Sequence, residues 1–259
     1  MTAVIHPAAT LGPNVQLGEF VVIEEGAVLG ARVTLGHHVV IHAGTVLGDD
    51  VWVGDGAVLG RAPRPAPTSA VRTPPSLPAL HIGPASIVGA GAVIYQGTTI
   101  GDHTMIGDHA FVRDRCQIGS HVIVGSHVTI ENEVTIGDYT KLQTGVYLCA
   151  WVTIEDHCFI APCVVTTNDN FMGRTERRFT ARGGCTIRHG ARVGANVTLL
   201  PNVEVGAEAF VAAGAIVTRD VPPATLVMGT PARAVRRVPP DEFAEPASPH
   251  PHDHGQATP

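Results

Sequence analysis

Large apolar residues recur at every sixth position over most of the chain. Counting from Ile5, and again from Ile82 and Ile187 after two interruptions, thirty such positions all carry Ile, Leu or Val. An amphipathic helix would space its apolar residues by three and four, and a half-buried strand by two. A strict period of six fits neither element, so the pattern indicates an internal structural repeat.

Two other places in each six-residue unit, or hexad, are restricted. The fifth place is Ala, Val, Thr, Ser or Cys in all 29 complete hexads, and the fourth is Gly, His, Asn or Asp in 19 of the 29. Those four residue types best tolerate a positive φ. Each hexad is therefore predicted to be a short strand followed by a tight turn. The first place should point inward, and the fifth should be sterically confined.

Three hexads make one triangular coil of 18 residues, so the thirty hexads predict an all-β, parallel β-helix of about ten coils. Two stretches fall out of phase and are predicted to be loops, and the first is too rich in proline to continue a strand ladder. The predicted organisation is N-terminal coils at 1–60, a Pro-rich loop at 61–81, the main β-helix at 82–223 with a loop at 166–186, a C-terminal segment at 224–240, and a disordered tail at 241–259.

Composition excludes several classes of protein. The formal net charge is −6, only 15% of residues are charged, and no long basic run occurs, which argues against a nucleic-acid binder. No apolar stretch reaches the roughly 18 residues of a membrane span, and Met1 to Thr10 does not resemble a signal peptide. Five cysteines without CxxC spacing suggest reduced thiols. We therefore expect a cytoplasmic protein with no nucleic-acid or membrane partner.

The hexads from residue 5 to about 237 resemble the hexapeptide-repeat acyltransferases, which are left-handed parallel β-helices. The left hand is implied by this resemblance alone, because the general rule for parallel crossovers favours a right hand. The resemblance also implies a homotrimer with active sites in the clefts between adjacent prisms. The first 60 residues resemble the start of the lipid A acyltransferases as well, although the helical C-terminal domain of those enzymes has no counterpart in the pattern.

The stretch EDHCFIAPCVVTTNDNFMGRTERR, Glu155 to Arg178, resembles the nucleotide-aminosugar N-acetyltransferases. This resemblance implies acetyl transfer from acetyl-CoA to the amine of a nucleotide-linked amino sugar. The residues it implies are Asp169, Asn168 and Glu155 as catalytic groups that orient or deprotonate the amine, and Gln143, Asn170, Arg174 and His189 as substrate contacts. The chain departs from that family where Thr144 and Gly145 replace two Asn.

The same stretch resembles the maltose and galactoside O-acetyltransferases, which carry a catalytic His-Pro after a Thr. Asn168, Asp169 and Asn170 occupy that neighbourhood here, without a His. A hydroxyl needs a positioned base to attack at neutral pH, whereas an amine already has a free lone pair in part. The missing His therefore favours N-acylation. An O-acyltransferase that uses His189 or His157 as its base remains the alternative.

The sequence NVTLLPNVEVGAEAFVAAGAIVTRDVPPATLVMGTPARAV resembles the acyl-CoA-binding end of these enzymes. The resemblance implies that backbone amides near Ala195 and Ala213 hold the pantetheine arm, and that Arg219, Arg233 and Arg236 meet the phosphates. The fork of N–H donors on Arg suits phosphate. A non-catalytic structural β-helix is a second alternative, but such a protein would have no reason to retain this end.

Histidines do not predict a metal site. Six of the fourteen occupy the turn place, where backbone geometry explains them, and the sequence typical of the zinc-binding hexapeptide carbonic anhydrases is not found around His103, His109, His121 and His127. His250, His252 and His254 offer possible ligands but are expected in a solvated tail. With an acyl-CoA donor a Cys nucleophile is unnecessary. We therefore expect acetyl-CoA as co-substrate and no metal.

Overall fold

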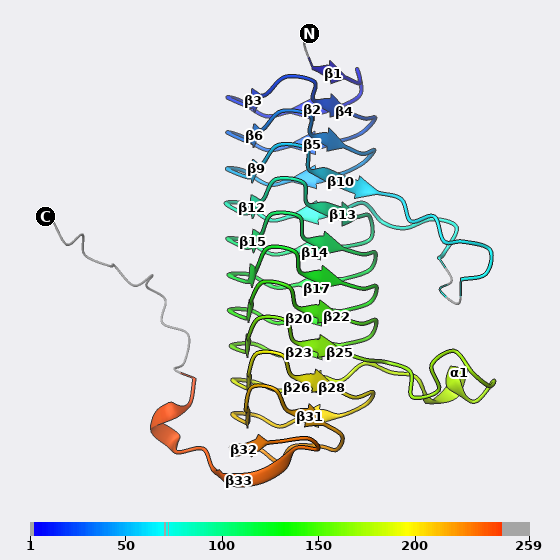
Figure 1. Cartoon of the computed structure of the whole chain (residues 1–259). Helices are drawn as coiled ribbons and strands as arrows, with labels where there is room; N and C mark the ends of the chain where they lie inside the picture. Colours follow the sequence, from blue (N-terminus) through cyan, green and yellow to red (C-terminus); the bar gives the residue numbers. More distant parts are fainter. Residues whose placement is uncertain (1–2, 70, 72, 245–259) are drawn as a thin grey trace, which may run out of the picture.

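The computed structural model describes residues 3–69, 71 and 73–244, and it is a tall prism of stacked coils (Figure 1). Each coil contributes one short strand, mostly of two residues, to each of three sheets. Successive coils are in register at a spacing of 18 residues, as in the pairing of Val4 with Val22 and of Ile5 with Ile23. Pairing is parallel in all three sheets except where the last strand turns back.

We name the sheets A, B and C in the order in which the chain meets them. Sheet A contains β1 (Val4–Ile5), β4 (Val22–Ile23), β7 (Val40–Ile41), β10 (Val58–Arg61), β13 (Val93–Tyr95), β16 (Phe111–Val112), β19 (Thr129–Ile130), β22 (Tyr147–Leu148), β25 (Val165–Thr166), β28 (Thr198–Leu199) and β31 (Ile216–Val217). Sheet B contains β2 (Thr10–Leu11), β5 (Val28–Leu29), β8 (Val46–Leu47), β11 (His81–Ile82), β14 (Thr99–Ile100), β17 (Gln117–Ile118), β20 (Thr135–Ile136), β23 (Thr153–Ile154), β26 (Thr186–Ile187) and β29 (Glu204–Val205). Sheet C contains β3 (Gln16–Leu17), β6 (Thr34–Leu35), β9 (Trp52–Val53), β12 (Ile87–Val88), β15 (Met105–Ile106), β18 (Ile123–Val124), β21 (Lys141–Leu142), β24 (Phe159–Ile160), β27 (Arg192–Val193), β30 (Phe210–Val211), β32 (Thr225–Met228) and β33 (Arg233–Arg237).

The predicted fold class is confirmed. The 10 strands of sheet B define ten complete coils, and β31, the bridge of Val221 to Val205, and β32 add a further one. Helix is confined to α1 (Arg178–Ala181) and the 3-10 turn Pro240–Glu242 within the described residues. No helix in this part of the chain is long and apolar enough to cross a membrane.

The turn place behaves as predicted. The six histidines at that place, His38, His103, His109, His121, His127 and His157, all have φ between 55 and 59°. Bulky residues adopt the same left-handed conformation there, with φ of 58° at Tyr139 and 69° at Trp151. L-residues rarely adopt this conformation, so the stacked coils impose it on the turn regardless of residue type.

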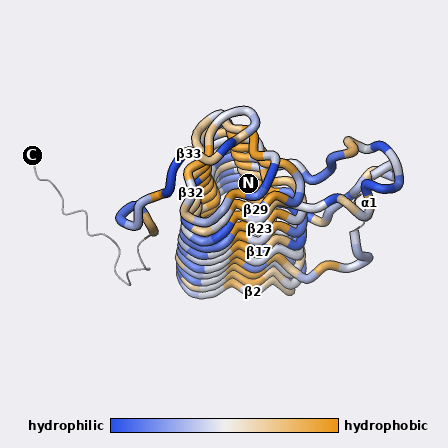
Figure 2. The backbone as a smooth tube through the Cα atoms, turned by 90° about the horizontal axis from the view of Figure 1, so that it is seen from below, coloured by the Kyte–Doolittle hydropathy of each residue, from blue (hydrophilic) through white to orange (hydrophobic). Residues whose placement is uncertain are grey.

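The core consists of the first and fifth places of the hexads. Ile23, Leu29 and Ile41 at the first place and Val21 and Ala27 at the fifth are at most 1% exposed. Equivalent residues of successive coils stack directly, so strand positions of like hydropathy form stripes that run along the prism (Figure 2). Burial of a continuous apolar column through every coil supplies the main stabilising free energy of the fold.

Both loop insertions leave the prism at the same corner. Strands β10 and β25, which precede the two loops, belong to sheet A, and the strands that follow them belong to sheet B. We call this edge the AB corner, and the other two the BC and CA corners. The loops therefore project from one side of the prism, several coils apart (Figure 1). The sequence pattern predicted each loop but not that they share a corner.

The C-terminal segment folds back after β32. Strand β33 pairs with it antiparallel, and the chain then follows a defined course through Ala244, whose N–H lies 3.2 Å from the Glu208 carboxylate. Residues 241–244, expected in the disordered tail, thus contact the prism. The three tail histidines, His250, His252 and His254, lie outside the described residues.

Four of the five cysteines are buried, and we expect them to be inert towards thiol reagents. Burial raises the pKa of the Cys116, Cys158 and Cys185 thiols to about 12 and that of Cys149 to about 11, whereas Cys163 is exposed. Because the thiolate is the reactive form, Ellman's reagent at about pH 8 should titrate only Cys163 in the folded protein and all five thiols after denaturation. Rapid reaction of two or more thiols in the folded protein would contradict this packing.

Candidate functional site

A cavity of about 470 Å³ opens at the AB corner beneath the two loops. Side chains from four successive coils and from both loops line it: Val71, Arg115, Glu131, Asn132, Glu133, Tyr147, Ala150, Trp151, Asn168, Asp169, Arg178 and Arg182. A second cavity of about 540 Å³ adjoins it and shares Arg178 and Arg182. Pro67, Thr68 and Ser69 of the first loop line this second cavity together with the second loop, so both insertions contribute to one site.

Charged residues on the cavity wall are stacked by the 18-residue repeat. Arg115 lies 2.6 Å from the buried Asp114 carboxylate and donates to Glu133 at 2.8 Å in the next coil. Arg113 donates to Glu131 at 3.0 Å across the same pair of coils. Partial burial acts to raise the pKa of Glu133, but the Arg115 guanidinium outweighs it and holds that pKa below its usual range. The wall therefore presents a lattice of ion pairs that spans two coils.

Two amide side chains of this wall have hydrogen-bonding groups without a partner in the described residues. Asn132 is only 2% exposed, and its Nδ2 donates to Glu133 at 3.1 Å. Its Oδ1 has no hydrogen-bond partner among the described residues. Asn168 lines the same cavity, and no described side chain or backbone group hydrogen-bonds its side-chain amide. A buried acceptor without a partner is costly, and because Asn132 Oδ1 is covered by protein, a ligand donor would reach it only after a local side-chain movement.

Arginines cover the other side of the cavity. Arg178 lies 3.8 Å from Asp169, and its buried Nε has no partner within the described part of the chain. Arg182 stacks on the Trp151 ring, with 4.8 Å between the guanidinium carbon and the ring centroid. Arg178 and Arg182 each line both cavities, which suits an anionic group placed between them.

Asp169 is occupied with the loop backbone. Its carboxylate accepts hydrogen bonds from the N–H groups of Phe171 at 2.8 Å and Gly173 at 3.0 Å. The Gly173 N–H, followed by that of Phe171, holds the pKa of Asp169 below its ordinary value. A carboxylate with a lowered pKa is a weak base, so this geometry suits shaping the loop better than removing a proton.

Glu155 lies elsewhere, at the BC corner after β23. It accepts hydrogen bonds at 2.8 Å from Arg188 and from the His189 N–H, and the Arg188 guanidinium lowers its pKa. Within one chain, Asn168 and Asp169 are thus brought together, but Glu155 is not with them. His189, expected as a substrate contact, also lies at the BC corner.

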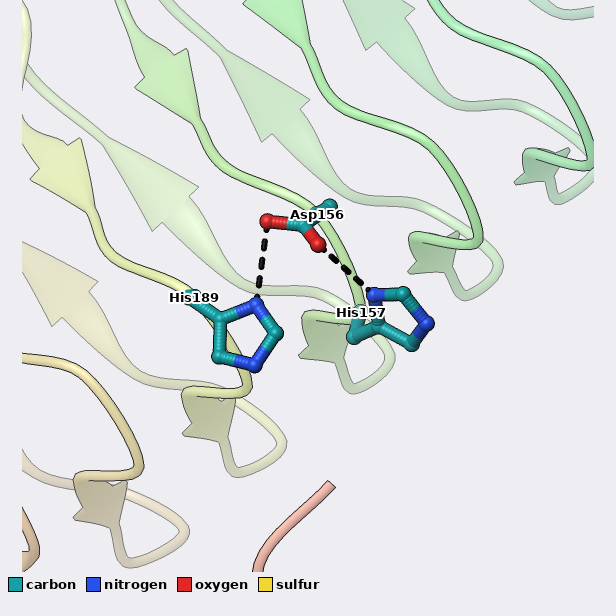
Figure 3. A group of neighbouring side chains, drawn as sticks. All are labelled: Asp156, His157 and His189. Carbon is teal, nitrogen blue, oxygen red and sulfur yellow. Dashed lines mark hydrogen bonds and ion pairs between the residues drawn. The ribbon is translucent and has the colours of Figure 1, made fainter. Parts of the chain in front are cut away.

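Asp156, His157 and His189, which we call the BC cluster, converge at that corner (Figure 3). Asp156 Oδ2 lies 2.9 Å from His157 Nδ1, and its Oδ1 lies 3.0 Å from His189 Nδ1. Burial acts to raise the pKa of Asp156, but hydrogen bonds from His189 and His157 outweigh it and lower the pKa. The cluster ends a stacked ladder of rings, His103, His121, Tyr139, His157 and His189, with centroid spacings of 4.7 to 5.5 Å.

Ala195 and Ala213, whose amides are expected to bind the pantetheine arm, lie at the CA corner because they follow strands of sheet C. Gln143 also follows a strand of sheet C and lies at the same corner. At this corner a carboxylate in the next coil caps the amide in two coils: the His37 N–H donates to Asp55 and the Ala90 N–H to Asp108. Ala213 lies 18 residues beyond Ala195, at the position from which a carboxylate would accept a hydrogen bond from the Ala195 N–H. Consequently the N–H groups of Ala195 and Ala213 have no acceptor in the described structure. The N–H groups of Asp108, Ser126 and Thr144 at this corner also lack an acceptor among the described residues, so free donors run along this edge through to the last coils.

The remaining expected residues are exposed. Arg219 follows β31 at the AB corner, while Arg233 and Arg236 lie on β33, where Arg236 is 3.6 Å from Glu242. Asn170 and Arg174 lie on the surface of the second loop and line neither of the two cavities at the AB corner. The sequence did not lead us to expect Asn132 and Arg115 at the site. A signal was present, because the polar triplets RDR at 113–115 and ENE at 131–133 lie one 18-residue coil apart.

Comparison with known proteins agrees with the repeat. A model of six bacterial transferase hexapeptide repeats matches residues 80–114, 97–132 and 133–168, and a succinyl-transferase hexapeptide-repeat model matches 20–61 and 189–219. A serine acetyltransferase of Buchnera aphidicola is 37% identical over 95 residues, covering 37% of this chain and 32% of that enzyme. A 2,3,4,5-tetrahydropyridine-2,6-dicarboxylate N-acetyltransferase of Staphylococcus aureus is 56% identical over 45 residues, or 17% and 19% of the two chains.

The chain thus spans about a third or less of the length of these curated relatives. Among solved structures, the Arabidopsis UDP-N-acetylglucosamine acyltransferase matches with a TM-score of 0.60 and 20% identity, over 92% of this chain and 73% of that one. A likeness at this identity supports the fold. The two repeat models together match well over half of the chain. The strands of the matched stretches belong to three sheets in which successive coils pair at a spacing of 18 residues. The chain belongs to the family of bacterial transferase hexapeptide-repeat proteins.

Proposed function

We propose that the protein transfers an acyl group, and specifically acetyl, from acyl-CoA to the amine of a nucleotide-linked amino sugar. The observation that carries this proposal is the cavity of about 470 Å³ at the AB corner, which is lined by Asn168, with its unpartnered side-chain amide, and by Asn132, with its covered and unpartnered Oδ1. Two carbonyl acceptors suit the two N–H bonds of a neutral amine and would direct its lone pair outward. Relatives named as acetyltransferases support the reaction class.

The chemistry requires little basicity from the protein. A neutral amine attacks the thioester carbonyl, and the tetrahedral intermediate then expels the CoA thiolate and loses a proton to give the amide. Asp169 and Glu155 are both held as ionised acceptors by other partners. We therefore assign orientation of the amine to Asn132 and Asn168, and assign to Asp169 the shape of the loop that covers it.

The arginines favour a nucleotide-linked acceptor. Arg178 and Arg182 stand between the two cavities, so a sugar in the first would place a diphosphate against both guanidinium groups. Arg178 Nε is a buried donor without a partner, which a phosphate oxygen would satisfy.

The cavity proposed for the acceptor lies at the AB corner, and the free amides proposed for the donor lie at the CA corner, so sheet A separates them within one chain. This separation favours transfer between neighbouring protomers of a homotrimer. The outer face of sheet C carries exposed apolar residues, Trp52, Ile87, Met105, Ile123 and Phe159, interrupted by Lys141, and sheet A exposes Tyr147 and Val165. Sheet B exposes Val28 but presents Thr99, Gln117, Thr135 and Thr153 in the later coils. Apolar stripes of this kind mark packing surfaces.

Sedimentation equilibrium should give three times the 27.0 kDa chain mass, and a monomer would contradict the trimer.

The donor edge is tested by Ala213→Asp. A carboxylate at this place would cap the Ala195 N–H, as Asp108 caps Ala90 at 2.8 Å, and would oppose the CoA phosphates. The apparent Kd for acetyl-CoA should rise at least about tenfold, equivalent to about 1.4 kcal/mol. Ala90→Asp adds the same charge at the same hexad place and corner, several coils away, and should leave the Kd unchanged. Equal affinities in all three proteins would contradict a donor site at this edge.

Thermal shifts test the acceptor class. Ligands that bind only the folded protein raise its melting temperature by mass action. CoA with one nucleotide amino sugar should give a shift that the hydroxyl analogue does not give. Equal shifts with the hydroxyl analogue would contradict recognition of the amine, and no shift with CoA would contradict acyl transfer.

A further inference from the structure

The BC cluster brings three potential metal-ligand atoms together. It lies away from the two cavities at the AB corner and from the free amides of Ala195 and Ala213 at the CA corner. Asp156 and His157 follow β23, whereas His189 follows β26 in the next coil, 33 residues beyond Asp156. One ligand atom from each residue lies within 4.8 Å of the others. Both imidazoles turn their Nδ1 atoms towards the same carboxylate (Figure 3).

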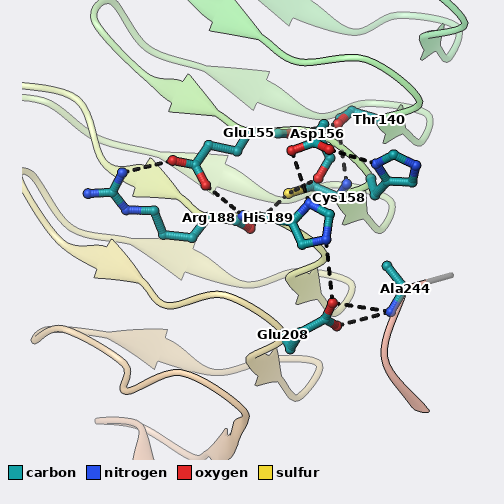
Figure 4. A network of polar contacts seen from close by, with 9 residues as sticks. Thr140, Glu155, Asp156, Cys158, Arg188, His189, Glu208 and Ala244 are labelled. Carbon is teal, nitrogen blue, oxygen red and sulfur yellow. Dashed lines mark hydrogen bonds and ion pairs between the residues drawn. The ribbon is translucent and has the colours of Figure 1, made fainter. Parts of the chain in front are cut away.

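Neighbouring groups hold these rings in place. His157 stacks on Tyr139 with 5.0 Å between centroids, and the backbone N–H of His189 is anchored on Glu155. On the far side of the His189 ring, Nε2 lies 3.7 Å from the Glu208 carboxylate, which the Ala244 N–H contacts in turn (Figure 4). A carboxylate near the outer nitrogen of a histidine is the usual support for a metal-ligating imidazole.

Two imidazole nitrogens and one carboxylate oxygen form a donor set that suits borderline divalent ions, Zn²⁺ above all. The side chains of Asp156 and His189 are 44% and 42% exposed, so water can reach the ion and complete its coordination. Imidazole, in contrast, is a poor ligand for Mg²⁺ or Ca²⁺.

We propose that Asp156, His157 and His189 form a Zn²⁺ site that joins the coils of β23 and β26. The sequence had led us to expect no metal, and this inference goes beyond the proposed acyl transfer, because it assigns no step of that reaction to the ion. The loop after β25 separates the two coils in sequence, so a bound ion would link them directly at the level of the insertion. Such a link adds to the stability of the folded state.

The test is a Zn²⁺ titration of the full chain by competition with a chromogenic chelator, together with the melting temperature with and without Zn²⁺. His189→Gln and Asp156→Asn should each weaken Zn²⁺ binding at least tenfold and remove the Zn²⁺-dependent rise in melting temperature. His121→Gln, a change in the same ring ladder away from Asp156, should retain both. Circular dichroism of each variant reports whether the β-helix is intact.

The tail histidines need a separate control, because the chain leaves Ala244 beside Glu208. A full-length variant with His250→Ala, His252→Ala and His254→Ala together should keep the Zn²⁺ affinity, or lose part of it if the tail completes the coordination. In either case His189→Gln must weaken binding. No Zn²⁺ binding by the wild-type chain, or binding that only the tail substitutions reduce, would overturn the proposal. Neither readout depends on acyl transfer.

Discussion

Asn168→Ala should lower kcat/KM for the amine acceptor by about 100-fold while leaving the affinity for acetyl-CoA unchanged. The side-chain amide of Asn168 lines the AB cavity and has no partner in the described structure, so it is available to the acceptor. Loss of one orienting contact lets the amine leave its line of attack on the thioester, and misplacement on the scale of 1 Å is enough for an effect of this size. Steady-state kinetics with both substrates varied would separate the acceptor effect from the donor effect.

Asn170→Ala is the matched control for this change. It removes the same amide two residues further along the same loop, from an exposed side chain that lines neither cavity at the AB corner. Its kcat/KM should stay within about twofold of wild type. If Asn170→Ala were the damaging change and Asn168→Ala the harmless one, the acceptor would have to lie on the outer face of the loop.

Ile136→Asn should cost about 4 kcal/mol of the free energy of unfolding and lower the melting temperature by about 10 °C. Ile136 stands at the first place of its hexad on β20 and is only 2% exposed. An amide at this position would face an apolar column without a hydrogen-bond partner, and the loss of the sec-butyl side chain would leave a gap in the stack. Urea unfolding followed by circular dichroism would measure the difference.

Thr135→Asn provides the control on the same strand. Thr135 is the neighbouring residue of β20 and points out of the prism, where it is exposed. Its substitution should change the unfolding free energy by no more than about 0.5 kcal/mol. Similar losses from both substitutions would contradict the assignment of the first place to the core and the sixth to the surface.

The repeat predicted the β-helix in such detail because each hexad place has one physical environment. First-place Ile136 and fifth-place Ala27 are buried, and turn-place His157 has a φ of 59°. The shared corner of the two loops could also have been found by counting. Fifteen strands, β11 to β25, lie between the insertions, and a multiple of three returns the chain to the same corner.

The same counting separates Glu155 from Asn168, whereas resemblance to a linear stretch of sequence suggested that they act together. Glu155 follows a sheet B strand and Asn168 a sheet A strand, so their side chains leave at different corners. The BC cluster is harder to predict from sequence. The loop places Asp156 and His189 33 residues apart instead of 18, and side-chain rotamers decide which way each imidazole faces.

Transfer of a labelled acetyl group tests the central claim most directly. The full chain would be incubated with [¹⁴C]acetyl-CoA and a panel of nucleotide sugars, each offered as the amine and as the matching hydroxyl compound. The account predicts label in the amino sugar product as an amide that resists hydroxylamine, together with release of an equal amount of free CoA. Label in the hydroxyl compound as a hydroxylamine-sensitive ester, or no transfer to any member of the panel, would contradict it.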